Sequence, residues 1–259
     1  MLLGTPEAEG AALAAALLEA WRATLQPDGG KRVVWNGRST VEWMMAQGLT
    51  NGPNHNEWQG FYWESRGRTI LNNAFTPNPS PPRVKYGNTT FDYSLRYVWD
   101  LKAHTESWYS PKHGTSRKGK SSAPLNDADA MDSCIDEQGL GFLMVGGRGI
   151  DDDDEAFVSW HREFKAANGV KSKQSNSGRS NPRKAAFEPL HVEAFFIPNT
   201  SALDAAKVSG QITGFRQGPQ APKSDGSKGS ARKGKYHLHV PKARTSDLNV
   251  TRYEWPHSH

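Results

Sequence analysis

The sequence predicts an α/β fold with a central mixed sheet flanked by helices, followed by C-terminal strands that carry basic loops. Segments with helix-capping signals alternate with β-branched and aromatic runs, a pattern typical of α/β proteins. The run "GLGFLMVGGRG" at 139–149 is almost continuously apolar between glycines, as expected of a buried central strand. The chain of 259 residues is long enough for one domain with a sizeable core, and we expect a single domain over 1–259.

The N-terminal part is predicted to contain three helices. The first begins with Thr5 as N-cap and Pro6 in the first helical position. The second covers 39–47 and ends at Gly48, after a short strand or turn at 31–38. The third is "NEWQGFYWESRGRTILNNAF" at 56–75, with Asn56 as N-cap.

The third helix carries two acidic residues of interest. Glu57 and Glu64 are seven positions apart and therefore share a helix face. Gly60 between them would let a backbone or a ligand approach closely. An open alternative is that both glutamates are simply solvated.

The next strand region, "FDYSLRYVWDLKAHTESW" at 91–108, carries charges that a buried strand would not tolerate alone. Asp100 and Lys102 share one strand face because side chains alternate. In one straight strand Asp92 would lie about 26 Å from Asp100, too far to share a metal ion. If the chain reverses near 95–97, Asp92 comes opposite Asp100 and the three polar groups converge.

The rest of the chain alternates loops with regular elements. A polar loop is expected at 110–124 and a helix at 126–138, capped by Asn126 or Asp127 and closed by Gly139. The acids of "DDDDE" at 151–155 are expected at the positive N-terminal end of a helix that reaches 169. Two basic loops at 168–184 and 216–235 accompany strands at 191–198 and 235–241.

The charge distribution indicates a polyanionic partner. Residues 1–160 hold 15 Lys and Arg against 20 Asp and Glu, whereas residues 161–259 hold 17 against 7. A basic surface suits nucleic acid, with arginines reading bases and lysines meeting phosphates, although a merely soluble basic surface is an open alternative. The candidate DNA-binding residues are Lys112, Arg117, Lys118, Lys120, Lys165, Lys171, Lys173, Arg179, Arg183, Lys184, Arg216, Arg232, Lys233 and Lys235.

Other compositional features narrow the class of protein. The single cysteine, Cys134, excludes an internal disulfide framework and suits a reducing cytoplasm, which is the expected location. No apolar run approaches the roughly 20 residues that a membrane-spanning helix needs. The opening residues lack a basic region and contain Glu7, Glu9 and Glu19, which favours a helix over a signal peptide.

Two carboxylates and a lysine at the end of a strand suit phosphodiester hydrolysis. Carboxylate oxygens are the ligands that Mg²⁺ prefers, and the metal would polarise a scissile phosphate. Lys102 would orient or deprotonate the attacking water and offset charge that develops on phosphorus. Asp92 and Asp100 would be metal ligands, and Glu57 or Glu64 would complete the shell.

This pattern resembles the PD-(D/E)xK nuclease superfamily, in particular type II restriction endonucleases. The matching segments are "NEWQGFYWE", "TFDYS", "VWDLKAH", "NDADAMDSCIDEQ" and "GLGFLMVGG", which cover a catalytic core at about 55–148, with DNA recognition expected at about 161–259. The sequence departs from the family pattern because Phe91, rather than proline, precedes Asp92, and the interval to Asp100 is short.

The resemblance implies a restriction-endonuclease-like core and an Mg²⁺-dependent type II enzyme. The family implies a homodimer that cuts double-stranded DNA at a specific sequence to 5′-phosphate and 3′-hydroxyl ends, with a cognate methyltransferase encoded nearby. The alternatives are a DNA repair or structure-specific nuclease and a non-catalytic basic nucleic-acid-binding protein. A zinc site formed by His191, His237 and His239 is a further alternative, as is contact of these histidines with bases or phosphates.

Overall fold

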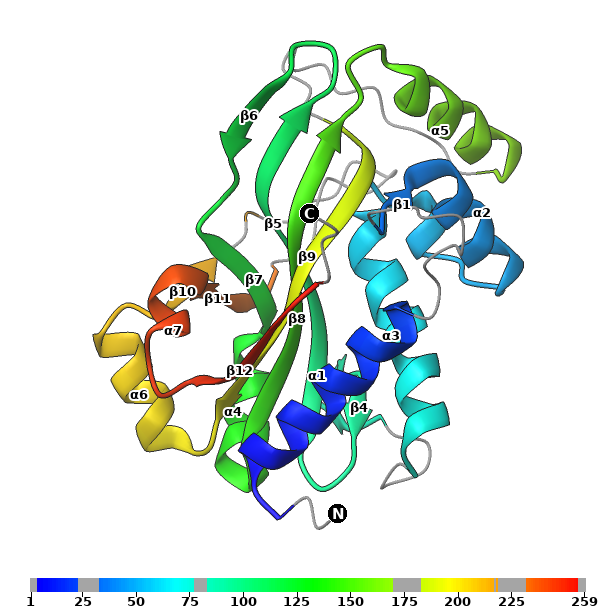
Figure 1. Cartoon of the computed structure of the whole chain (residues 1–259). Coiled ribbons are helices and arrows are strands. Elements are labelled where there is room, and N and C mark those ends of the chain that lie inside the picture. Colours follow the sequence, from blue (N-terminus) through cyan, green and yellow to red (C-terminus); the bar gives the residue numbers. More distant parts are fainter. Residues whose placement is uncertain are drawn as a thin grey trace.

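The computed structural model describes residues 4–22, 33–76, 83–169, 183–216, 218 and 232–255. They form an α/β structure in which helices flank a mixed central sheet, as the sequence predicts (Figure 1). The helices are α1 (Pro6–Arg22), α2 (Gly37–Ala46), the 3₁₀ turn η1 (Gly52–Asn54), α3 (Trp58–Ala74), α4 (Ala128–Gln138), α5 (Ala156–Ala167), α6 (Thr200–Val208) and α7 (Val240–Arg244). The strands are β1 (Trp35–Asn36), β2 (Lys85–Tyr86), β3 (Thr89–Thr90), β4 (Tyr93–Ser94), β5 (Val98–Ser110), β6 (Thr115–Lys118), β7 (Ser122–Asp127), β8 (Leu140–Asp151), β9 (Lys184–Ile197), β10 (Ile212–Arg216), β11 (Gly234–His239) and β12 (Asn249–Glu254).

The central sheet has the order β1-β9-β8-β5-β4, with β12 beside β9 and β6 beside β5. β5 and β8 are parallel, and the chain between them passes through β6, β7 and α4; the other pairs of this sheet are antiparallel. The glycine-bounded apolar run is β8, which pairs with β5 on one side and β9 on the other. The prediction of a buried central strand is confirmed.

Two apolar clusters cover the two faces of this sheet. Helices α1, α2 and α3 lie on one side in Figure 1, where Trp63, Trp99 and Leu101 are buried. On the other side α4 and α6 cover a cluster that includes Phe142 and Phe195. Successive side chains of β5 and β8 therefore point alternately into the two apolar clusters.

Part of β5 has a strand on one side only. Its first residues pair with β4, and its last four pair with β6. Between them, at 100–106, β5 pairs with β8 but with no second strand among the described residues. The open stretch contains Asp100 and Lys102.

Several local predictions need correction. The segment 110–124 is not a loop throughout: β6 folds back on β5 as a hairpin, and β7 begins at Ser122. Helix α3 begins at Trp58 after Glu57, which makes no side-chain cap, so Asn56 is not its N-cap. The strand expected at 191–198 begins earlier, at Lys184.

The acidic run at 151–155 has a different role from the one expected. β8 continues to Asp151. Asp152 accepts the N–H groups of Phe157 at 2.9 Å and Val158 at 2.7 Å, and Asp154 accepts that of Ala156 at 3.1 Å, so both cap α5. Asp151 pairs with Arg117 of β6. Four of the acids, 151–154, thus serve structure through specific contacts rather than through solvation.

The close approach of α3 to β5 depends on Gly67. A Cβ atom at this position would collide with the side chain of Leu101, which is fully buried. Gly60, which the sequence singles out, has no atom within 4 Å of the position that a Cβ would take. Gly67, rather than Gly60, therefore allows the close contact.

These two glycines are expected to respond oppositely to substitution by alanine. Gly60→Ala should raise the free energy of unfolding by up to about 1 kcal/mol, because alanine favours the helix. Gly67→Ala should lower it by about 1–3 kcal/mol, because the added methyl overpacks the contact with Leu101. Urea denaturation of both variants measures the difference, and equal effects would contradict the packing described here.

Candidate functional site

The chain reverses between β4 and β5, which brings Asp92 to Asp100. Tyr93 pairs with Trp99 in antiparallel register, and the turn is closed by a hydrogen bond from Leu95 N to Tyr97 O of 3.2 Å. One carboxylate oxygen of Asp92 accepts the backbone N–H of Leu101 at 3.1 Å. The reversal on which the sequence argument depended is confirmed.

Asp100 and Lys102 form a close buried ion pair. The carboxylate of Asp100 is almost fully buried, and its Oδ2 touches the Lys102 ammonium but receives no well-aligned hydrogen bond in the described structure. Burial raises the pKa of Asp100 to about 8, against the opposing effect of Lys102. Burial alone would lower the pKa of Lys102, but Asp100, Glu64 and Asp92 together raise it well above its usual value. Lys102 is therefore a stable cation.

Glu64 joins this group from α3. Burial raises its pKa to about 7; Lys102 opposes the shift and Asp92 adds to it. Arg68, one turn further along α3, donates from Nη1 to Asp92 Oδ1 at 2.9 Å. Glu64 and Arg68 lie within one helical turn of Gly67. The tight packing of α3 on β5 at Gly67 therefore brings both side chains close to Asp92, Asp100 and Lys102.

A pocket of about 310 Å³ opens beside Glu64. It contains two guanidinium groups, those of Arg68 and Arg83, together with the Glu64 carboxylate. The other lining residues are Gly48, Leu49, Thr50, Asn51, Gly52, Phe61 and Ser65. An anionic group could enter this pocket and meet both arginines next to the carboxylates.

Glu57 lies in a different environment from Glu64. Its Oε2 accepts the Lys184 ammonium at 2.8 Å, and Lys184 also donates to Thr105 Oγ1 at 3.1 Å and lies over the ring of Trp108. The Lys184 side chain is only 5% exposed. Of the two glutamates, the structure thus favours Glu64 as the one that completes the acidic group of Asp92 and Asp100. Lys184 was expected to be exposed and to contact DNA, and this prediction is wrong because the side chain is buried.

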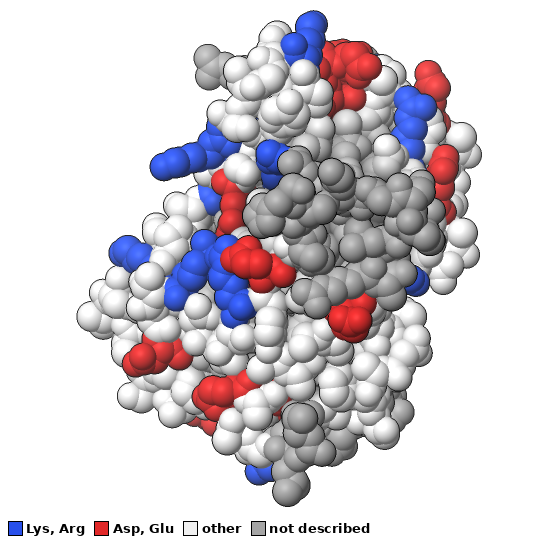
Figure 2. Space-filling view, viewed as in Figure 1, with Lys and Arg blue, Asp and Glu red and all other residues white. Residues whose placement is uncertain are grey.

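The other candidate DNA-binding residues are dispersed. Arg117 and Lys233 are exposed but paired with acids, and Lys165 donates to Asn56 Oδ1 at 3.1 Å. Figure 2 shows Lys and Arg on the viewed face in separate small groups beside Asp and Glu. The exposed or half-buried candidates are Lys112, Arg117, Lys118, Lys120, Lys165, Arg183, Arg216, Arg232, Lys233 and Lys235, and Lys171, Lys173 and Arg179 lie outside the described residues.

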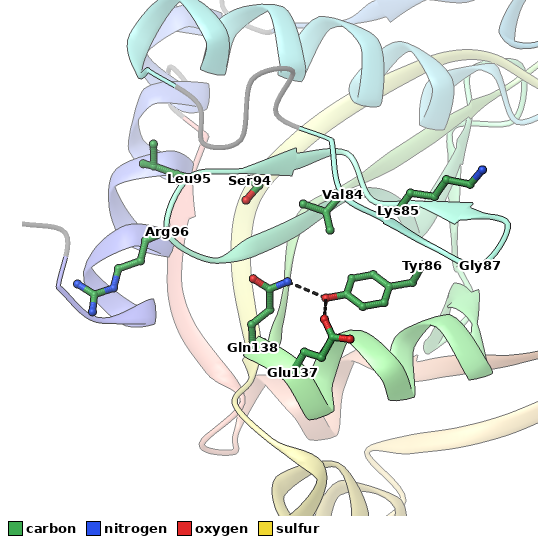
Figure 3. Close-up of a pocket in the computed structure, with 9 residues that line it drawn as sticks. All are labelled: Val84, Lys85, Tyr86, Gly87, Ser94, Leu95, Arg96, Glu137 and Gln138. Carbon is green, nitrogen blue, oxygen red and sulfur yellow. Dashed lines mark hydrogen bonds between the residues drawn. The ribbon is translucent and has the colours of Figure 1, made fainter.

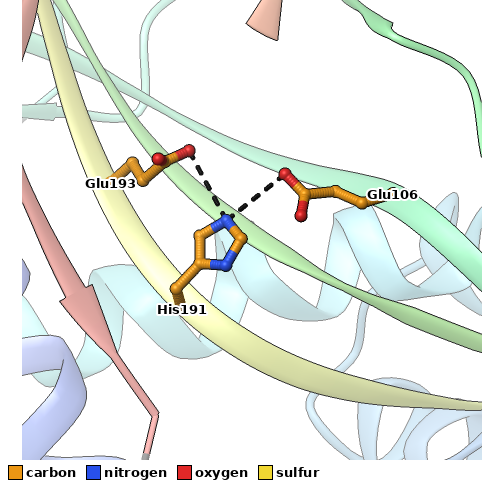
Figure 4. A group of neighbouring side chains, drawn as sticks. All are labelled: Glu106, His191 and Glu193. Atoms are coloured by element: carbon orange, nitrogen blue, oxygen red, sulfur yellow. Dashed lines mark ion pairs between the residues drawn. The ribbon is translucent and has the colours of Figure 1, made fainter. Parts of the chain in front are cut away.

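A second charged cluster, which the sequence analysis did not anticipate, lies on β5 and β9 (Figure 4). Glu106, His191 and Glu193 place one ligand atom each within 4.8 Å of one another, and this group could hold a metal ion. His191 Nε2 lies 3.4 Å from Glu106 and 3.5 Å from Glu193. In the described part of the chain neither Asp92, Asp100 and Glu64 nor the three histidines of the zinc alternative are grouped so closely.

Two arginines neutralise this cluster. Arg244 of α7 contacts Glu193 and Glu106 at 2.5 Å each, and Arg252 of β12 contacts Glu193 at 2.9 Å and His191 Nδ1 at 3.1 Å. Although burial opposes the shift, His191 and Arg244 lower the pKa of both glutamates to about 2. A metal ion would have to displace guanidinium groups, so the cluster is already balanced in charge.

A further pocket lies beside the turn between β4 and β5 (Figure 3). It has a volume of about 590 Å³. Tyr86 donates to Glu137 at 2.6 Å and accepts from Gln138 at 2.7 Å on its wall. The lining residues are Val84, Lys85, Tyr86, Gly87, Ser94, Leu95, Arg96, Glu137 and Gln138, and they include none of the predicted catalytic residues.

Comparisons with known proteins give no match: no family model, no curated protein and no solved structure corresponds to this chain. No helix in the described parts of the chain combines the length and apolar character needed to cross a membrane. The only cysteine, Cys134, is free and buried in α4. The geometry of the charged groups is therefore the guide to the function of this protein.

The raised pKa of Glu64 predicts a pH-dependent stability. A carboxyl whose pKa is about 7 when folded holds its proton more tightly than in the unfolded chain, so its stabilising effect disappears as pH rises through 7. Between pH 6 and pH 8 this loss amounts to about 1 kcal/mol. Thermal unfolding at both pH values should show a smaller fall in Tm for Glu64→Gln than for the wild type, and parallel falls would refute the shift.

The balanced cluster predicts a strong effect of removing one arginine. Arg244→Met should lower the free energy of unfolding by about 3 kcal/mol, because it leaves buried carboxylate charge poorly compensated. Lys242→Met, at an exposed position of the same helix, is the matched control and should change stability by less than about 0.5 kcal/mol. Denaturant unfolding compares the two, and a stability loss no larger than that of the control would show that the pairs contribute little.

Proposed function

We propose that the protein is an Mg²⁺-dependent, sequence-specific endonuclease that cleaves double-stranded DNA, as type II restriction enzymes do. One observation carries the proposal. Asp92 directly precedes β4, which is antiparallel to β5, and Asp100 and Lys102 lie on β5 with Glu64 near them. This arrangement has the acidic strand, the DxK strand and the helix acid of the PD-(D/E)xK superfamily.

The chemistry of the donor set suits a divalent cation, although Asp92, Asp100 and Glu64 would have to move closer together to share one ion. Three carboxylates share the site with Lys102 and Arg68, and burial leaves two of these carboxylates with raised pKa values. Asp92, Asp100 and Glu64 would hold Mg²⁺, which when bound would polarise the scissile phosphate and lower the pKa of a water molecule.

The remaining residues have roles that follow from their charge. Lys102, held as a cation, would donate hydrogen bonds to a phosphate oxygen and stabilise the charge that develops there. Arg68 and Arg83 would bind the phosphate backbone at the neighbouring pocket. Attack of water on phosphorus would break the bond to the 3′ oxygen and leave 5′-phosphate and 3′-hydroxyl ends.

The order of elements supports a restriction-endonuclease-like core. Helix α3 precedes Asp92 with its short strand β4 and then the DxK strand β5, and α4 leads to β8, parallel to β5. We propose a cytoplasmic homodimer that works beside a cognate methyltransferase, with the exposed basic residues as DNA contacts. A repair or structure-specific nuclease would use the same site.

A second candidate function is a non-catalytic basic nucleic-acid-binding protein. The observation in its favour is that Lys102 pairs with Asp100 and Arg68 with Asp92, so both aspartates already have cationic partners. In that case the carboxylates would serve stability alone. Cleavage and binding must therefore be measured separately.

Plasmid digestion with and without Mg²⁺ tests the proposed activity. The wild type should give discrete fragments only with Mg²⁺, whereas Lys102→Ala and Glu64→Gln should lose at least about 100-fold in rate because they remove charge stabilisation and a metal ligand. Glu57→Gln, a change of the glutamate that pairs with Lys184 instead, should still cut. Absence of cleavage by the wild type on unmodified and modified DNA, with intact binding, would favour the second candidate function.

A further inference from the structure

The small sheet formed by β10, β11 and β7 has one buried and one exposed face. Ile212, Leu238 and Ala123 are buried where the sheet covers the apolar cluster of α4 and α6. Side chains alternate along a strand, so Thr213, Phe215 and His237 belong to the other face. In Figure 1 this sheet lies on the side of the central sheet away from α1 and α3.

Phe215 is unusual on that outer face. It is 42% exposed, and it is the only aromatic side chain among the large exposed hydrophobic residues of the described structure. Its ring is stacked on the imidazole of His237, with centroids 4.7 Å apart and planes at 27°. The two rings therefore form a small stack that is partly exposed to solvent at Phe215.

Positive charge surrounds these rings. Burial lowers the pKa of the His237 imidazole, and the nearby charges of Lys120 and Lys235 lower it further. Neither lysine forms an ion pair with another residue that the structure describes.

We propose that this face binds a single nucleic-acid strand, with an unpaired base added to the stack of Phe215 and His237 on the exposed side of Phe215, and with its phosphates near Lys120 and Lys235. Aromatic side chains stack on bases of any sequence, and lysine and arginine track the backbone. The complementary charge decides against an apolar protein partner, which would leave the lysines unpaired. This site goes beyond the proposed cleavage and does not require it.

Fluorescence anisotropy in EDTA tests the proposal without cleavage. Short labelled oligothymidylate and oligouridylate, compared with a duplex of the same length, show whether a DNA or an RNA strand is bound. Phe215→Ala should weaken binding of the single strand about 5- to 150-fold, the range found for loss of one stacked base. Phe215→Trp should retain binding of the single strand. Lys235→Ala should reduce the slope of log Kd against log salt concentration by about 1, the amount expected for the loss of one phosphate contact.

Two controls make the result specific to stacking. Val208→Ala shortens another exposed apolar side chain, on α6, and should bind as the wild type does. A 2-aminopurine base in the strand should lose fluorescence on binding, and Phe215→Ala should abolish that loss. Equal binding by Phe215→Ala and wild type, preference for the duplex, or no binding of either strand would overturn the proposal.

The same proteins separate this site from the proposed nuclease. Lys102→Ala should bind the single strand with unchanged affinity, because Lys102 is in a different part of the structure. A wild type that binds the strand but never cuts plasmid would overturn the nuclease and leave the stacking site standing. If Phe215→Ala cuts plasmid and binds the single strand as the wild type does, the nuclease stands and the stacking site is overturned.

Discussion

The close packing of α3 on β5 is the constraint on which the candidate site depends. Without a side chain at Gly67, the helix can rest on Leu101, and its neighbours Glu64 and Arg68 then reach the charges of β4 and β5. A larger residue would move both groups away together. The site is thus an outcome of apolar packing on one side of the helix and of charge on its margin.

The two charged clusters on β5 differ in how their charge is compensated. Glu106 and Glu193 have two guanidinium partners, and their pKa values fall to about 2. Asp100, Glu64 and Asp92 are three carboxylates that share Lys102 and Arg68, and the pKa values of Asp100 and Glu64 rise to about 8 and about 7. A buried network with balanced charge suits a structural role. A buried network with an excess of carboxylates suits the binding of a cation.

The sequence predicted those features that depend on neighbouring residues. Asp100 and Lys102 are two apart on one strand, and a turn at 95–97 was enough to place Asp92 beside them. It could not predict the Glu106 cluster, because Arg244 and Glu106 are 138 positions apart and meet only through the register of β5 and β9 and the position of α7. It also misjudged Lys184, since a basic residue in a polar stretch gives no sign that strand β9 begins there and buries it.

The hairpin of β5 and β6 shows how acidic residues can tune a basic surface. Asp151 holds the Arg117 guanidinium, and Asp153 accepts the Ser110 hydroxyl at 2.8 Å and the Lys112 N–H at 2.9 Å. Any anion that reaches Arg117 must compete with an intramolecular carboxylate of fixed position. Weak or isolated anions lose that competition, whereas a polymer that engages several cations at once can win it through its high local concentration of charge. The Asp151 carboxylate would therefore weaken the binding of monovalent anions at Arg117 more than that of polyvalent anions.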